Sequence, residues 1–139
     1  MEASRAHGTA ARVLAVDDSA EMLILVQASI ERFGHSVHAV DSGTAAIAAA
    51  NQEPFDLVIL DVDMPGLNGL DVGRALRENP QTREAMIAMH TSLDEAQVRI
   101  GFDAYDLFLC KPCCPLQLGE RVDRLLQDAQ ARRRLATAN

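Results

Sequence analysis

The sequence predicts an α/β fold with an open, doubly wound parallel sheet. Two short apolar runs, residues 13–16 and Leu57–Leu60, are continuous rather than alternating with polar residues, which is typical of strands buried on both faces. Each run is followed, after a short turn, by a segment with helical spacing. Strands that alternate with helices pair in parallel, because right-handed crossovers place the helices on both faces of one sheet.

Five strands are expected, and turn residues separate them from their neighbours. Asp41-Ser42-Gly43 follows the second strand, Pro54 precedes the third, and Gly101 precedes the fifth. The expected strands are, in chain order, Arg12–Val16, Ser36–Val40, Leu57–Leu60, 86–90 and 106–110.

Five helices are expected after these strands. The first begins near Ser19 and ends at Gly34, and the last begins at Pro115, which the first turn of a helix tolerates. The second, third and fourth helices cover residues 44–50, 70–77 and 94–100. Apolar residues at helical spacing predict the buried stripes, which are Leu23, Val26, Ile30 and Phe33 in the first helix and Leu118, Val122, Leu125 and Ala129 in the last.

Length and composition indicate one globular domain. The chain has 139 residues, of which 48% are hydrophobic and 24% charged, and this suits a single core with no room for a second domain. We expect a disordered leader over residues 1–10, the domain over 11–131 and a C-terminal tail over 132–139.

The charge pattern limits the partners. A net charge of -7 argues against a nucleic-acid binder, because affinity for a polyanion depends on clustered Lys and Arg, and the basic run 132–134 suits the end of a helix. No apolar stretch is long enough to cross a membrane, and residues 1–11 lack the apolar core of a signal peptide. We therefore expect a cytoplasmic protein that binds neither membranes nor, by itself, nucleic acid.

The three cysteines do not predict a structural metal site. Cys110, Cys113 and Cys114 lie close together in the sequence, but a tetrahedral zinc site needs a fourth ligand. His7 lies in the leader, and His35 and His38 flank a strand. We expect reduced thiols whose role the sequence leaves open.

Polar side chains gather where the strands of the predicted sheet end. Asp17 and Asp18 close the first strand, and Asp61 closes the third. If these strands are parallel neighbours, three carboxylates meet at one edge of the sheet, where open α/β sheets bind their ligands. Carboxylate oxygens suit Mg²⁺. Thr91 and Lys111, which end the fourth and fifth strands, would lie at the same edge.

In this order the residues resemble the receiver domain of two-component response regulators. The matching elements are Asp17-Asp18, Asp61 with Met64-Pro65-Gly66 and Asn68-Gly69 after it, Thr91, Phe108 and Lys111-Pro112. Lys111 is also the single lysine among 13 Lys and Arg residues, which suggests a requirement for a compact ammonium group. The resemblance covers nearly the whole chain, from about Arg12 to Ala131.

The resemblance implies a flavodoxin-like sheet in the order 2-1-3-4-5 with five helices, and a magnesium-dependent phosphorylation. Asp61 would be the phosphoacceptor, and a histidine kinase or histidine phosphotransfer protein the donor. Asp18, Asp61 and the backbone carbonyl of Asp63 would bind Mg²⁺, while Asp17 would orient water beside the ion. Lys111 and Thr91 would hold phosphoryl oxygens, helped by the N–H groups near Val62 and Ser92.

The resemblance also implies how the signal leaves the site. Thr91 and Phe108 would switch together and change the face made by the fourth helix, the fifth strand and the fifth helix, although an aromatic residue on a buried strand could also be ordinary core. Asp63 and Leu93 occupy places that help to set the lifetime of the phosphoryl group. The Lys111-Pro112 bond is expected to be cis.

The sequence departs from the family pattern in three ways: Asp63 is acidic, Leu93 is apolar, and the segment before the fifth strand is altered. Ala104-Tyr105 stands where receivers usually have Gly-Ala, after a short fourth helix. His90 is next to Thr91, but strand alternation points it to the opposite face, so no catalytic role is expected.

Three functions remain open. The chain could be a stand-alone receiver, monomeric or weakly dimeric, that controls a protein target and catalyses only its own phosphorylation and dephosphorylation. It could also be the receiver of a larger DNA-binding regulator or hybrid kinase. The third possibility is a small hydrolase of the haloacid dehalogenase type, in which Asp63 would be the acid/base. Met64-Pro65-Gly66, the acidic pair and the lack of room for a substrate cap argue against the hydrolase.

Overall fold

The computed structural model describes residues 10–138 and contains one five-stranded parallel sheet in the order β2-β1-β3-β4-β5. The predicted fold class and strand order are confirmed. The strands are β1 Arg12–Val16, β2 Ser36–Val40, β3 Leu57–Leu60, β4 Met86–Thr91 and β5 Leu107–Cys110. The helices are α1 Ala20–Glu31, α2 Gly43–Gln52, α3 Gly69–Glu78, α4 Glu95–Gly101 and α5 Pro115–Ala138.

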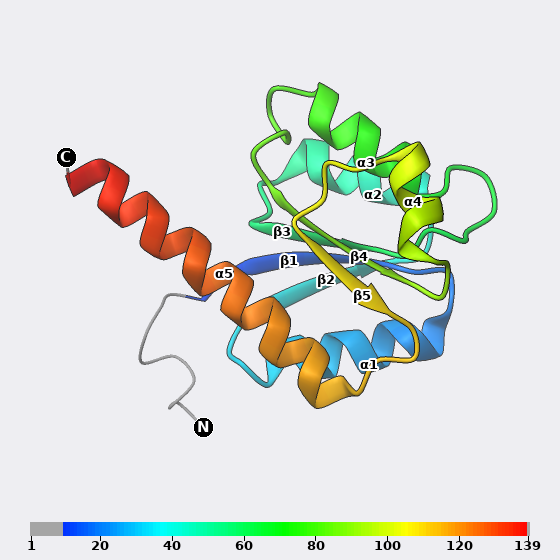
Figure 1. Ribbon diagram of the computed structural model, residues 1–139, viewed down its shortest axis with the longest axis horizontal. Helices are drawn as coiled ribbons and strands as arrows, with labels where there is room; N and C mark the ends of the chain where they lie inside the picture. Colours follow the sequence, from blue (N-terminus) through cyan, green and yellow to red (C-terminus); the bar gives the residue numbers. More distant parts are fainter. Residues whose placement is uncertain (1–9, 139) are drawn as a thin grey trace.

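The sheet is the middle of three layers, with α1 and α5 on one face and α2, α3 and α4 on the other (Figure 1). Successive residues of each strand point to opposite faces, so each strand supplies both cores. The strand residues in the core beneath α2, α3 and α4 include Leu14, Val16, Val58, Leu60, Ile87 and Met89. Those beneath α1 and α5 include Val13, Ala15, Leu57, Ile59, Ala88 and Leu109.

The helix boundaries follow local capping signals. The Ser19 side chain accepts a hydrogen bond from the backbone N–H of Met22 and caps α1, which begins at Ala20. The chain reverses at Gly34, whose φ of 92° lies in the left-handed region that favours glycine. Asn68 and Asp71 cap the first turn of α3 reciprocally.

The last helix differs from the prediction in two ways. Leu125, predicted to be buried, is half-buried and packs against the core beneath α1 and α5, while Leu126, four residues after Val122 on the same helix face, is more deeply buried. Residues 132–138, expected as a tail, continue α5, which extends past the sheet (Figure 1). The expected leader lies outside the described residues, apart from Ala10.

A buried hydrogen-bond network fastens α5 to the start of β1. The Nδ1 atom of His35 accepts from the backbone N–H of Ala11 at 2.9 Å, and Nε2 lies 2.7 Å from the Asp123 carboxylate. Gln127 donates to the other carboxylate oxygen at 2.6 Å. Because Nδ1 accepts, the proton of the neutral imidazole is on Nε2, which donates to Asp123.

Within residues 10–138 no helix is both long and apolar enough for a membrane span.

Candidate functional site

The parallel pairing of β1 with β3 brings the predicted acidic residues together. Val16 pairs with Leu60, so Asp17 and Asp61 leave adjacent strands at the same level. The backbone N–H of Asp61 donates to Val16 O at 3.0 Å, which fixes this alignment. Carboxylate oxygens of Asp17, Asp18 and Asp61 all lie within 4.8 Å of one another. In the described part of the chain this is the one group of three or more acidic, His or Cys side chains close enough to hold a metal ion.

Lys111 reaches this group from the end of β5. Its Nζ lies 2.8 Å from Asp17 Oδ2 and 3.4 Å from Asp61 Oδ1. The side chains of both aspartates are almost entirely buried, with 4% and 6% of their surface exposed. A buried carboxylate is costly unless it is paired, so the ammonium group makes this arrangement possible.

The surroundings of Asp61 disfavour its charge. Burial raises the pKa of Asp61 above its ordinary value, and the neighbouring Asp17 carboxylate adds to the increase. Lys111 and the backbone N–H of Asp63 oppose it. A cation bound beside Asp61 would therefore keep the carboxylate ionised, which a nucleophile requires.

The two residues of the acidic pair have different roles in the structure. Both oxygens of Asp17 are engaged, since Oδ1 accepts from the backbone N–H of Ser19 at 2.9 Å and Oδ2 accepts from Lys111. Asp18 is exposed. The donors thus fit a hard cation such as Mg²⁺, with the Asp18 carboxylate accessible to a partly hydrated ion.

Thr91 lies at the carboxyl end of β4, which pairs with β3. Its side chain is fully buried, and its hydroxyl oxygen accepts from the backbone N–H of Leu93 at 3.1 Å. Because the oxygen accepts this bond, the hydroxyl hydrogen can be donated elsewhere. The backbone N–H of Lys111 donates to Thr91 O at 2.8 Å and joins the ends of β4 and β5.

Phe108 is half-buried on β5 and packs against the core beneath α2, α3 and α4. Its ring centroid is 5.9 Å from that of Tyr105, with the planes tilted by 51°. Phe108 pairs with Met89, two residues before Thr91 on the same face of β4. The structure therefore places both residues of the predicted switch on one face of the sheet.

The other predicted residues lie at the rim of the site. Asp63 is exposed, with its backbone N–H 3.4 Å from Asp61 Oδ1, and Leu93 is half-buried in the loop after β4. Val62 and Ser92 directly follow Asp61 and Thr91. The Lys111-Pro112 bond is cis, as expected.

Two glycines near the site are required by geometry. A Cβ atom at Gly69 would lie 2.3 Å from the carbonyl oxygen of Asp61, so the start of α3 can approach β3 only without a side chain there. Gly66 has a φ of 74° in the loop between them. The sequence shows these residues as part of a motif but gives no signal for the close approach.

His90 lies on the face of the sheet covered by α1 and α5, opposite Thr91, as predicted, but its surroundings were not foreseen. It is buried, and a hollow of about 100 Å³ beside it is lined by α1, Pro112 and the start of α5. Burial, assisted by the nearby Lys111 charge, lowers the pKa of His90 to about 4. The imidazole is therefore neutral near pH 7.

The cysteines stand apart from the acidic group. Cys110 and Cys114 are exposed, and burial raises the pKa of the Cys113 thiol. In residues 10–138 they do not combine with other donors into a metal-binding group of the kind formed by the aspartates. The absence of structural zinc stays a prediction, which metal analysis of the purified protein would test.

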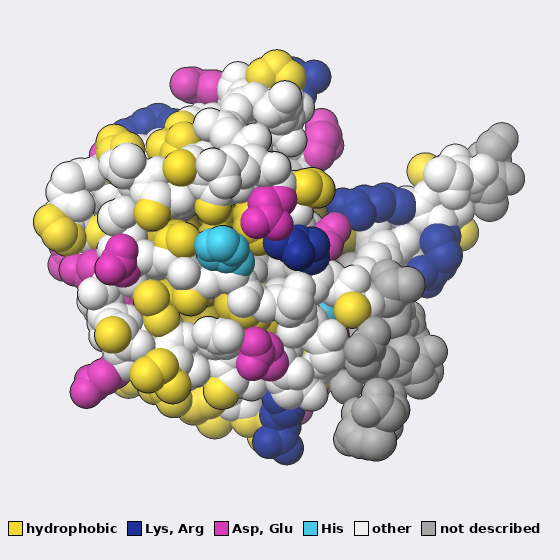
Figure 2. All heavy atoms as spheres, turned by 180° about the vertical axis from the view of Figure 1, so that it is seen from behind, with side chains coloured by type: hydrophobic (Ala, Val, Ile, Leu, Met, Phe, Trp, Pro, Cys, Tyr) yellow, Lys and Arg dark blue, Asp and Glu magenta, His cyan; other side chains and the backbone are white. Residues whose placement is uncertain are grey.

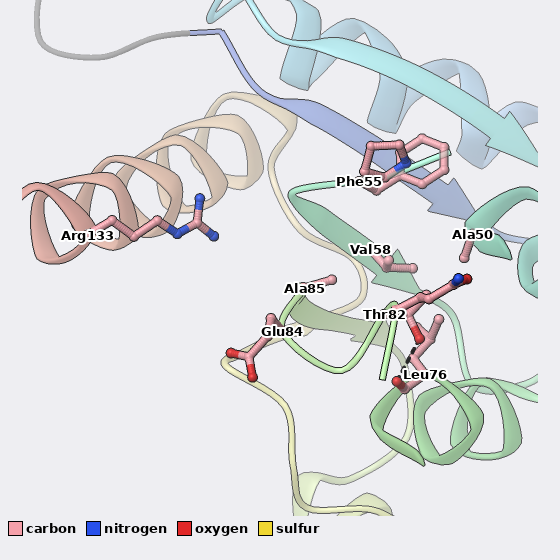
Figure 3. A pocket seen from close by; sticks show the side chains of 10 residues that line it. Ala50, Phe55, Val58, Leu76, Thr82, Glu84, Ala85 and Arg133 are labelled. Carbon is pink, nitrogen blue, oxygen red and sulfur yellow. Dashed lines mark hydrogen bonds between the residues drawn. The ribbon is translucent and has the colours of Figure 1, made fainter. Parts of the chain in front are cut away.

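A second hollow, of about 130 Å³, lies at the opposite end of the sheet (Figure 3). Its lining includes Phe55 before β3, Ala85 before β4, and Arg133 of α5. The Thr82 hydroxyl donates to Leu76 O at 2.7 Å in its wall. None of the predicted site residues lines this hollow.

Comparison with known proteins agrees with this geometry. Residues 13–123 match the model of the response regulator receiver domain. The sensor protein GacS of Pseudomonas syringae pv. syringae is 40% identical over 121 residues, which are 81% of this chain and 13% of that protein. The transcriptional regulatory protein ResD of Bacillus subtilis is 35% identical over 120 residues, covering 85% of this chain and 49% of ResD. The chain thus spans only part of these relatives.

A solved structure of a response regulator has the same fold as this chain. The response regulator protein TrrA of Thermotoga maritima, in complex with Mg²⁺-BeF, superposes with a TM-score of 0.74 at 28% identity, over 83% of this chain and 98% of TrrA. The matches favour a signalling domain over the hydrolase alternative. The chain belongs to the response regulator receiver domain family.

Proposed function

We propose that Asp61 is the phosphoacceptor of this receiver, in a reaction that depends on Mg²⁺. The observation that carries the proposal is the position of Asp61: its carboxylate lies within 4.8 Å of two others and 3.4 Å from the chain's single lysine. This cluster of charged groups suits phosphoryl transfer, because catalysis of that reaction depends mostly on positioning the reactants and neutralising the charge of the transferred group.

Asp18, Asp61 and the backbone carbonyl of Asp63 would hold the Mg²⁺ ion, which keeps Asp61 ionised and offsets the charge of the phosphoryl group. Asp17, whose two oxygens already accept hydrogen bonds, orients water and Lys111. The rim residues Asp63, which is exposed, and Leu93, which is half-buried, would help to set the rate at which the phosphoryl group is lost.

The Asp61 carboxylate oxygen attacks the phosphorus of a phosphohistidine on a kinase or phosphotransfer protein. The new P–O bond forms as the P–N bond breaks, and the histidine nitrogen leaves with the bonding electrons and takes up a proton. Lys111 moves its ammonium group from the two aspartates to a phosphoryl oxygen, and Thr91 donates its free hydroxyl hydrogen to another.

A protein donor fits the surface beside the site. Ile24 and Leu25 of α1 are 68% and 46% exposed, and Leu25 lines the hollow next to His90. Exposed apolar residues of this kind support contact with another protein. The donor itself is a histidine kinase or a histidine phosphotransfer protein.

The output is a change in the face made by α4, β5 and α5, driven by Thr91 and Phe108, that controls a protein target in the cytoplasm. Nucleic acid is not a partner of the isolated chain, because its net charge is -7. On the face seen in Figure 2, basic side chains are interspersed with acidic ones over the body of the protein. We propose a monomer or weak dimer that catalyses only its own phosphorylation and dephosphorylation.

A second candidate is the same receiver acting within a larger regulator or hybrid kinase. The supporting observation is that the chain spans 13% of GacS and 49% of ResD. In that case the output domain supplies DNA binding or catalysis, and the chemistry at Asp61 is unchanged.

Phosphoramidate, a small P–N phosphodonor, tests the proposal without a cognate kinase. With Mg²⁺, intact-mass measurement should find one phosphoryl group on the wild type, and none after chelation of the metal or in Asp61→Asn. Asp103→Asn is the matched control, because Asp103 is exposed in the loop before β5 and should not affect labelling. Labelling of Asp61→Asn at the wild-type rate would refute the assignment.

A further inference from the structure

Tyr105 joins α4 to the segment that leads into β5. Its hydroxyl donates to the Glu95 carboxylate and accepts from Arg99 Nε at 3.0 Å. Arg99 Nη2 lies 3.7 Å from the same Glu95 carboxylate, one helical turn away on α4. Burial and the bond to Glu95 raise the pKa of Tyr105, so the phenol stays protonated and remains a donor. We call Glu95, Arg99 and Tyr105 the Tyr105 clasp.

The ring of Tyr105 also contacts the residue proposed as the switch. It lies 5.9 Å from the Phe108 ring, centroid to centroid, and both rings pack against the core beneath α2, α3 and α4. Phe108 cannot turn toward Thr91 without changing this contact. One side chain therefore touches both α4 and the proposed switch.

The remaining attachments of α4 are few. Val98 is its single buried residue, and the Asp94 side chain makes no capping hydrogen bond. Ile100 is 88% exposed. At the far end of the helix, Arg74 donates to the carbonyl of Gly101. Across the described residues, the hydrogen bonds and ion pairs of the α4 side chains all involve the clasp.

The first turn of α4 is also linked to the phosphorylation edge. The Thr91 hydroxyl accepts from the Leu93 backbone N–H, and α4 begins at Glu95, two residues later. A movement of Thr91 toward a phosphoryl group would shift this loop and with it the carboxylate that holds Tyr105. The clasp thus resists the movement that phosphorylation requires.

We propose that the Tyr105 clasp restrains the unphosphorylated arrangement and so sets how readily phosphorylation at Asp61 moves Phe108 and α4. This inference rests on the proposed function and adds a positioning residue to it. Tyr105 stands where the sequence departs from the family resemblance, so the restraint is a property of this chain. A ligand that favours the phosphorylated arrangement binds more tightly once a contact that stabilises the unphosphorylated arrangement is removed.

Beryllofluoride with Mg²⁺, a phosphoryl mimic, measures the restraint. Its apparent affinity is followed through the amide NMR signals of Phe108 and α4. Tyr105→Phe keeps the ring but removes the hydroxyl, and it should bind about threefold to tenfold more tightly than the wild type, as expected for the net loss of one ordinary hydrogen bond at a partly exposed carboxylate. Glu95→Gln keeps an acceptor but loses the charge that strengthens the bond, so it should shift affinity in the same direction by a smaller amount. The double variant should add little to Tyr105→Phe, because both changes act on the same interaction.

Gln97→Ala, an exposed position on the same helix, is the matched control and should leave the affinity unchanged. Urea unfolding of each variant distinguishes the restraint from a purely structural role. If Tyr105 were merely structural, its substitution would lower the free energy of unfolding without increasing the affinity for beryllofluoride. If the wild-type spectrum responds to beryllofluoride but Tyr105→Phe and Glu95→Gln bind it with unchanged or weaker affinity, the restraint by the Tyr105 clasp is refuted and the proposed function still stands. A wild type whose spectrum does not respond would overturn the proposed function as well.

Discussion

The ammonium group of Lys111 donates a hydrogen bond of 2.8 Å to Asp17 Oδ2, although these residues are 94 positions apart in the sequence. The contact spans the edge of the sheet from β5 to β1, and Asp61 lies 3.4 Å from the same nitrogen. The single charge of Lys111 therefore offsets part of the charge of two buried carboxylates, and under the proposed function it would stabilise a phosphoryl group.

Lys111→Met should slow phosphorylation of Asp61 by about a hundredfold, in the range measured when one preorganised electrostatic donor is removed. Lys111→Arg should not restore the rate, because a planar guanidinium cannot replace a compact ammonium group between two carboxylates. Labelling kinetics with phosphoramidate and Mg²⁺ check both variants. Wild-type kinetics in Lys111→Arg would show that the site needs only a positive charge.

The two members of the acidic pair should contribute unequally to magnesium binding. Asp17→Ala is expected to weaken Mg²⁺ binding by about tenfold, as for a residue that acts through its neighbours. Asp18→Ala should weaken it more, because the Asp18 carboxylate is exposed and able to contact the ion. A calorimetric Mg²⁺ titration of both variants measures the ranking, with Asp103→Ala as a control for the loss of one charge. Equal affinities would contradict it.

Thr91→Ala should separate phosphorylation from output. The variant keeps the aspartates and Lys111, so Asp61 should still bind beryllofluoride, but the hydroxyl that draws the β4–α4 loop inward is missing. We expect local NMR shift changes around Asp61 and no change on α4 and β5. Thr82→Ala, at the opposite end of the sheet, is the control and should respond fully. Distant shifts that persist in Thr91→Ala would sink this mechanism.

His90 should make the fold sensitive to acid. The pKa of His90 is about 4 in the folded protein and near 6.5 when exposed, so the unfolded chain binds the proton first as the pH falls. The contribution of His90 to the free energy of unfolding is complete above pH 6.5 and should fall by up to about 3 kcal/mol between pH 6.5 and 4. His90→Leu should flatten this part of the stability curve.

The measurement is best made in Asp61→Asn. The pKa of Asp61 is raised in the folded protein, so the folded state takes up this proton before the unfolded chain does. Asp61 therefore adds to the free energy of unfolding as the pH falls, which would partly mask the loss from His90. Urea unfolding at several pH values gives the two curves, and His38→Gln, at an exposed histidine, is the control. Identical slopes with and without His90 would rule out its role.

Local patterns were enough to predict most of the fold and the meeting of Asp17, Asp18 and Asp61 at one edge of the sheet. Continuous apolar strands, helical spacing and turn residues define the elements, and the carboxyl-edge rule for parallel sheets brings Asp17 and Asp61 together. The contact of Lys111 with both depends on β5 lying two strands from β3, which only the complete sheet order determines.

Contacts between distant elements could not be predicted from local patterns. The bond from His35 to Asp123 joins positions 88 residues apart, and neither residue has neighbours in the sequence that signal it. The burial that lowers the pKa of His90 likewise comes from α1 and α5 together.

The most direct test of the account is to locate the phosphoryl group chemically. After reaction with acetyl phosphate and Mg²⁺, borohydride reduces an aspartyl phosphate to homoserine, and peptide mass spectrometry reads its position. The account predicts homoserine at position 61 alone, and only when magnesium is present. Homoserine at position 17, 18 or 63, or an unchanged Asp61 under conditions where label is incorporated, would contradict it.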